Sequence, residues 1–148
     1  MRYLCILIFF FYSATATAQV QSVELVASGL TCSMCSKAIF KALSQLDFVS
    51  EVKVDIEKSS YKVNFKSPEN VKIEQIREAV YDAGFAIETM QLTASFPNTK
   101  AVNEELVTLN GYQFKWKLTG TKNISNPQKV SIVNKEIQPT AGVYYLNF

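Results

Sequence analysis

The chain has 148 residues, no histidine, three cysteines and a formal net charge of +2. A charge so near zero gives no support for nucleic-acid binding, whereas a hydrophobic content of 48% is enough to build a buried core. Three cysteines without histidine also cannot supply the four Cys or His ligands of a structural zinc site.

The N-terminus has the pattern of a secretory signal peptide. Arg2 precedes an unbroken apolar run, Leu4–Tyr12, and the small residues Ala16-Thr17-Ala18 form a cleavage motif. The run is about half the roughly 20 residues that a membrane-spanning helix needs. We therefore expect residues 1–18 to be removed together with Cys5, and the mature protein to be secreted or periplasmic without stable membrane insertion.

The next 70 or so residues alternate between strand and helix patterns. A strand is predicted around Val23, Leu25 and Ala27, and a hairpin around 52–56 and 61–65. Helical spacing of apolar residues predicts one helix over 35–46 and a second over 73–83, ended by Gly84, before a last strand at 85–92. The order strand, helix, strand, strand, helix, strand predicts an α+β fold of the ferredoxin-like βαββαβ type.

The rest of the chain has a different composition. Residues 93–100 are predicted to be a linker, and 101–148 a small all-β unit of about four strands. Asn110-Gly111 accepts the positive φ angles of a two-residue hairpin turn. The alternation of Tyr112, Phe114 and Trp116 after it indicates the core side of a strand rather than a binding face. We expect this unit to dock on the first domain or on a partner.

Cys32 and Cys35 stand at the start of the first predicted helix. A helix N-terminus favours the thiolate, which binds soft metal ions and attacks disulfides. Two thiolates suit ions of low coordination number such as Cu(I) or Hg(II). The same pair could instead be a redox-active dithiol or a structural disulfide, so three interpretations follow from the residues alone.

The segment Gly29-Leu30-Thr31-Cys32-Ser33-Met34-Cys35 resembles the Gly-Met-Thr-Cys-x-x-Cys signature of heavy-metal-associated domains. The resemblance extends through Val52–Asp55 to Ala83-Gly84-Phe85 and covers residues 19–92. Leu30 stands where the family usually has Met, and the two side chains have similar volumes. Phe85 stands where copper ATPase modules often have an aromatic residue and eukaryotic chaperones a lysine. In layout the chain is similar to periplasmic mercury-binding proteins and copper chaperones.

This resemblance implies that Cys32 and Cys35 bind a metal ion, most readily Cu(I), with Hg(II) or another soft ion as alternatives. It also implies transfer of the ion to or from a donor or acceptor protein, no enzymatic activity and no catalytic residue. An ion bridging two copies of the chain is a further arrangement that such a site allows. A thiol–disulfide redox protein, and an interaction module with a structural disulfide, are the alternative functions.

Several neighbours of the two cysteines have two interpretations each. Met34 could add a thioether ligand or be an exposed helix residue, and Phe85 could shield the thiolates or belong to the core. Lys37 and Lys41 could contact an acidic partner or form an ordinary solvated helix face.

We expect the mature chain to begin at Gln19, because the apolar run is short and ends in the small-residue motif. Intact-mass measurement of the exported protein tests this expectation. A membrane-bound product that retains Met1 would contradict it.

Overall fold

The computed structural model describes residues 19–29, 33–96, 100–133 and 142–148. Residues 19–96 contain two α-helices, a short 3₁₀ helix and four strands. In chain order these are β1 (Gln19–Ser28), α1 (Ser33–Ser44), β2 (Val49–Asp55), β3 (Ser60–Phe65), η2 (Pro68–Asn70), α2 (Ile73–Asp82) and β4 (Ala86–Ser95).

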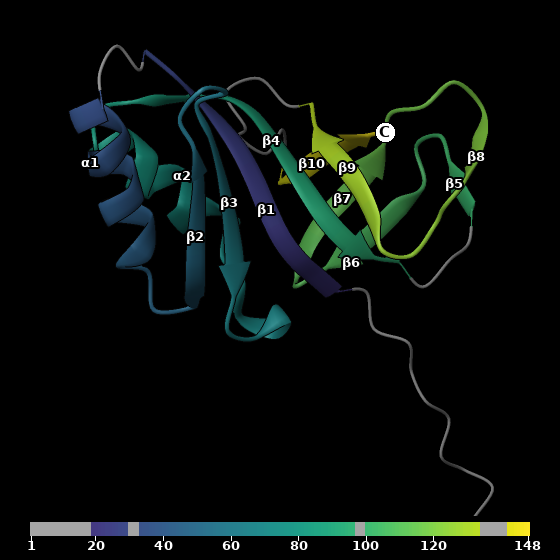
Figure 1. Ribbon diagram of the computed structural model, residues 1–148. Coiled ribbons are helices and arrows are strands. Elements are labelled where there is room, and N and C mark those ends of the chain that lie inside the picture. Colours follow the sequence, from purple (N-terminus) through teal and green to yellow (C-terminus); the bar gives the residue numbers. More distant parts are fainter. Residues whose placement is uncertain (1–18, 30–32, 97–99, 134–141) are drawn as a thin grey trace, which may run out of the picture.

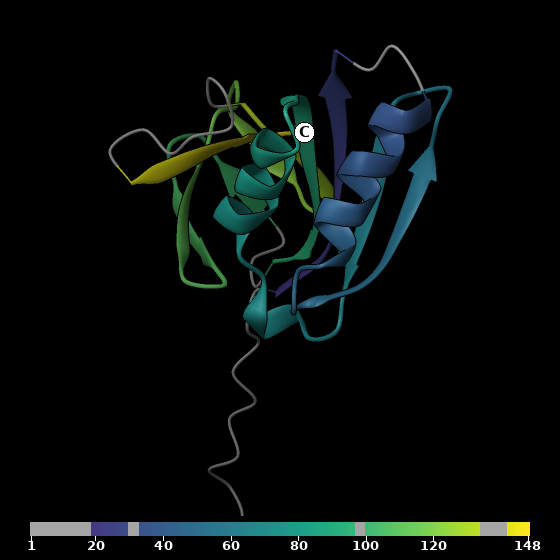
Figure 2. The ribbon, with the colours of Figure 1, turned by 90° about the vertical axis from the view of Figure 1, so that its left-hand side faces the viewer.

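The four strands form an antiparallel sheet in the order β2-β3-β1-β4. Both helices cover one face of the sheet, as Figure 2 shows. Their buried residues, among them Ile39, Leu43, Ile76 and Val80, recur at helical spacing and pack on the inward side chains of the strands. The ferredoxin-like α+β fold predicted from the sequence is confirmed.

Six short strands follow β4. They are β5 (Lys100–Val102), β6 (Leu106–Leu109), β7 (Tyr112–Trp116), β8 (Thr121–Asn123), β9 (Gln128–Ile132) and β10 (Val143–Asn147). The all-β character of the C-terminal part is confirmed, with six strands where the sequence indicated about four. β5 and β8 pair in a separate two-stranded sheet.

The other four C-terminal strands extend the main sheet. β9 pairs antiparallel with β4, and the order continues β4-β9-β10-β7-β6, which makes one sheet of eight strands (Figure 1). Residues 93–95, which the sequence placed in a linker, belong to β4 instead. Thr93 and Ala94 pair with β1 on one side and with β9 on the other, so hydrogen bonding to two neighbours keeps this stretch extended. The division into a metal-binding domain at 19–92 and a C-terminal unit at 101–148 stays a prediction.

The β6–β7 turn reaches back to the first half of the chain. Asn110 and Gly111 both have positive φ angles, 51° and 81°, as a type I′ turn requires. The Asn110 Oδ1 atom accepts a hydrogen bond from the backbone N–H of Val20 at 3.3 Å, and its Nδ2 donates to the carbonyl of Pro68. One side chain therefore connects the hairpin tip to the start of β1 and to η2.

Aromatic side chains of β7 and β10 pack together, and one of them bonds to α2. Phe114 and Tyr144 are fully buried and stack with ring centroids 5.5 Å apart, and Tyr112 meets Tyr144 edge-on at 6.1 Å. The prediction that Phe114 and Trp116 belong to the core is confirmed, and Tyr112 is half-buried. The Tyr144 hydroxyl donates to Glu74 Oε1 at 2.8 Å, which bonds β10 to α2.

Burial first, and the Glu74 carboxylate second, raise the pKa of Tyr144 far above the value of about 10 for a free tyrosine. Unfolding restores the lower pKa, so above about pH 10 the unfolded chain loses this proton while the folded chain retains it. The stabilisation is complete below pH 10 and is lost as pH rises towards the folded-state pKa.

We therefore expect the stability advantage of the wild type over Tyr144→Phe to shrink between about pH 10 and 12, by at most about 1.4 kcal/mol per pH unit. Urea unfolding followed by circular dichroism across this range measures the difference. A constant gap between the two proteins would contradict the assignment.

Candidate metal centre

Cys35 lies in the first turn of α1 and is half-buried. Ser33 and Met34 before it are exposed, whereas Ser36 after it is buried. Leu30, Thr31 and Cys32 lie outside the described residues, so the structure places one of the two predicted thiols. The position of Cys35 agrees with the helix start predicted from the sequence.

Two hydrogen bonds fix the end of β1, from which the cysteine loop departs. The Ala27 N–H donates to the Ser59 carbonyl in the β2–β3 turn at 3.2 Å, and the Ser28 hydroxyl donates to the Ala86 carbonyl at the start of β4 at 3.4 Å. Gly29 then turns the chain with φ of 82°, a left-handed angle that glycine adopts without strain. Strand β1 is thus anchored on both sides where it ends, at the upper end of the sheet in Figure 1.

A buried tyrosine lies beneath the first turn of α1. Tyr61 of β3 is fully buried, and its hydroxyl donates to the Ser36 carbonyl at 3.5 Å. Its alternation with Val63 indicated an inward-facing strand residue in the sequence, but nothing there indicated that it supports the residue next to Cys35.

Met34 and Met90 lie in very different surroundings. Met34 is 77% exposed on α1, and Met90 is fully buried in β4. Met90 is therefore a core residue, whereas Met34 has the exposure expected of a first-turn helix position. Phe85, at the junction of α2 and β4, is half-buried and packs against the core.

The flank of α1 beside Cys35 is basic and partly apolar. Lys37 and Lys41 are exposed, and α1 contains no acidic residue. A shallow pocket of about 180 Å³ lies between α1 and the end of β2 and is lined by Ser33, Ser36, Lys37, Phe40, Val54 and Ile56. The sequence pattern placed Ile56 in the strand, but β2 ends at Asp55 and the Ile56 side chain is 65% exposed.

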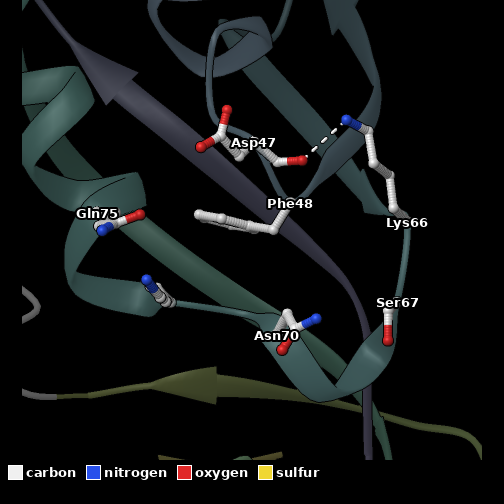
Figure 3. A pocket seen from close by; sticks show the side chains of 7 residues that line it. Asp47, Phe48, Lys66, Ser67, Asn70 and Gln75 are labelled. Atoms are coloured by element: carbon white, nitrogen blue, oxygen red, sulfur yellow. Dashed lines mark hydrogen bonds between the residues drawn. The ribbon is translucent and has the colours of Figure 1, made fainter.

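A second pocket, of about 380 Å³, lies at the opposite end of the sheet (Figure 3). The Phe48 ring faces it, and Lys66 Nζ donates to the Asp47 carbonyl at 2.8 Å. Its lining has oxygen and nitrogen donors but no sulfur, so it does not have the ligand chemistry of a soft-metal site. Within the described ranges, no three Cys, Asp or Glu side chains gather into a metal-binding group.

Comparison with known proteins identifies the family. A model of the heavy-metal-associated domain matches residues 25–86. The COP-associated protein of Helicobacter felis is 35% identical over 65 residues, which span 44% of this chain and 96% of that protein. The chain belongs to the heavy-metal-associated domain family. This confirms the resemblance seen in the cysteine segment.

Other relatives and solved structures of the family match the same half of the chain. The mercuric transport protein periplasmic component of Shigella flexneri is 35% identical over 72 residues, covering 49% of this chain and 78% of that protein. The copper chaperone CopZ of Staphylococcus haemolyticus is 32% identical over 59 residues, covering 40% and 85%. Oxidized MerP from Ralstonia metallidurans is 31% identical, with a TM-score of 0.42 and coverage of 47% and 97%.

The match to the family model ends at residue 86, before the C-terminal strands begin. Within the residues that the structure describes, neither helix is long and apolar enough to span a bilayer.

We expect Tyr61→Phe to lower the free energy of unfolding by about 1 kcal/mol, because the Ser36 carbonyl loses the hydrogen bond that the buried Tyr61 hydroxyl donates. Chemical denaturation monitored by circular dichroism measures the loss. An unchanged stability would show that this long hydrogen bond contributes nothing to the support of α1.

Proposed function

We propose that this chain is an exported metal carrier that binds Cu(I) through Cys32 and Cys35 and passes it to a partner protein. The observation that carries the proposal is the place of Cys35, in the first turn of α1 in a heavy-metal-associated domain. Cys32 stands three residues earlier in the chain.

The chemistry of the donor set supports a soft ion. The mature chain has two thiols and no imidazole, and thiolates favour soft, low-coordinate ions over the hard ions that oxygen ligands select. The N-terminal end of α1 supplies backbone N–H groups without helical partners, which favour the thiolate form. Relatives named copper chaperone and mercuric transport protein support Cu(I) and, as a second candidate, Hg(II).

Transfer follows from a site with two sulfur ligands. A thiolate of the partner adds to the bound ion, a cysteine of this chain then leaves it, and repetition of the exchange moves the ion to the partner. The ion keeps its oxidation state, and only metal–sulfur bonds form and break. The transfer therefore needs no enzymatic reaction. Such exchange requires a partner protein that donates or accepts the ion. The same site also allows an ion to bridge two copies of this chain.

Export is part of the proposal. It is supported by the apolar run and cleavage motif at the N-terminus and by relatives named as periplasmic components. In an oxidising compartment the two thiols must be kept reduced or loaded with metal promptly, since they could otherwise form a disulfide.

We expect the reduced, mature protein to bind one Cu(I), and Cys32→Ser or Cys35→Ser each to weaken binding at least about 100-fold, because one thiolate alone gives no bidentate site. Anaerobic competition with a chromophoric Cu(I) chelator measures the affinity. Met34→Leu is the matched control: its side chain is exposed, and we expect the affinity to remain unchanged.

Unchanged affinity in the variant lacking both cysteines would contradict the metal-carrier proposal. An insulin-reduction assay on the metal-free protein separates the redox alternative, which requires disulfide-reductase activity that a carrier lacks. Tighter binding of Hg(II) than of Cu(I), relative to a small dithiol, would favour the second candidate ion.

A further inference from the structure

Strand β2 is an open edge of the sheet. It pairs with β3 on one side, and no described strand pairs with its other side. The opposite edge of the ferredoxin-like part, β4, is covered by β9. An unpaired edge presents a row of N–H and C=O groups that can pair with another strand.

The residues of β2 determine how its open edge can pair. It contains no proline, and its charged residues Glu51 and Lys53 alternate with Val52 and Val54, so the charges share the face away from the helices. On the helix side, the partly exposed Phe40 and Ile56 border the shallow pocket between α1 and β2. An open backbone edge therefore adjoins exposed apolar surface, and Figure 1 shows α1 and β2 at this outer margin of the molecule.

The charge pattern of β2 is complementary to itself in one antiparallel register. If a two-fold axis passes through Val52, Glu51 stands opposite Lys53 of the partner subunit, and Lys53 opposite Glu51 of the partner subunit. Opposite charges directly across strands are favourable, and the two-fold axis doubles each contact. Within one chain Lys53 Nζ lies 3.5 Å from Glu51 Oε2, which also accepts a hydrogen bond from Asn64 Nδ2 at 3.1 Å. Both charged side chains are more than half exposed, so pairing exchanges this weak surface contact for the two ion pairs across the axis.

Two neighbouring registers also keep the charged faces of both strands on the same side of the sheet, but their charge pairs are less favourable. An axis at Lys53 brings two lysines together and sets Glu51 against Asp55 of the partner subunit. An axis at Val54 pairs Lys53 with Asp55 of the partner subunit but brings Glu51 against Glu57 of the partner subunit. Like charges directly opposite destabilise a strand pair, so the sequence of β2 selects the axis at Val52.

We propose that two copies of this chain form a dimer by antiparallel pairing of β2 with β2 about an axis at Val52. The axis is perpendicular to the sheet, so both α1 helices lie on the same face, side by side, and cover each other's apolar flank at Phe40. The two β2 strands run in opposite directions, so the two Cys35 turns lie at opposite ends of the strand pair. Unlike a dimer bridged by an ion, this dimer forms without metal, and the inference does not depend on the proposed function.

Sedimentation equilibrium of the reduced, metal-free mature chain tests the proposal. We expect a reversible dimer whose dissociation constant rises about tenfold or more in Lys53→Glu, because two attractive pairs become repulsive. The double variant Glu51→Lys/Lys53→Glu restores complementary pairs about the same axis and should restore the dimer. Lys100→Glu is the control, since it makes the same charge change at an exposed residue of β5, in the separate two-stranded sheet.

Circular dichroism of each variant verifies that the monomer remains folded. Three results would overturn the proposal: a monomeric wild type up to millimolar concentration, a dimer that Lys53→Glu leaves unchanged, or a double variant as weak as the single one. A dimer that appears only with Cu(I) and disappears in Cys35→Ser would also overturn it, because the contact would then be through the metal.

Discussion

Strand β1 pairs with β4 along nearly its whole length and with β3 over its middle residues, 22–26, and its inward side chains are almost completely buried. Both neighbours must be in register for Val23, Leu25 and Ala27 to face the helices, since a shift of one residue would turn them to solvent. The cysteine loop begins where this strand ends, and α1 begins where the loop ends. The place of Cys35 is therefore set by the most constrained strand of the sheet, and the hydrogen bonds of Ala27 and Ser28 extend that constraint to the last residues before the loop.

The C-terminal strands add to this framework in three places. β9 pairs with β4 over five residues, Asn110 bonds to both Val20 and Pro68, and Tyr144 bonds to Glu74 on α2. Buried residues from both parts of the chain belong to one hydrophobic core. The strands thus cover the flank formed by β4 and α2, while the flank formed by α1 and β2 stays exposed. In the proposed transfer, a partner reaches the Cys35 turn from the α1 side, where Lys37 and Lys41 are exposed.

Local patterns of the sequence were sufficient for the first half of the fold. The alternation in β2 and β3, the helical spacing from Ile39 to Leu43 and the glycine after α2 each reflect contacts within a short stretch of chain. The cysteine motif identified the family for the same reason, because its spacing is local. The burial of Tyr61 beneath Ser36 could not be predicted, since it depends on how β3 and α1 lie against each other.

The second half shows the limit more clearly. The Asn110-Gly111 turn and its hairpin were predicted, because turn type is determined by the two central residues. The pairing of β9 with β4 joins residues about 40 positions apart, and the sequence of neither strand indicates which strand it pairs with. Thr93–Ser95 looked like a linker for this reason: polar residues in an extended segment have the composition of a loop until a second neighbouring strand is known.

Rigidity and openness are divided between different parts of this molecule. The proposed carrier function requires thiols held near the geometry of the ion and a side from which another thiolate can approach. The position of the first turn of α1 is fixed from the side of the sheet, by β1, by Tyr61 and by the core. Exposed residues surround the turn itself, with Ser33 and Met34 before Cys35 and Lys37 after it. Because the added strands stiffen the sheet on the side of β4, they can stabilise the framework without covering that turn, and the family's binding geometry is compatible with a chain twice as long as the domain that provides it.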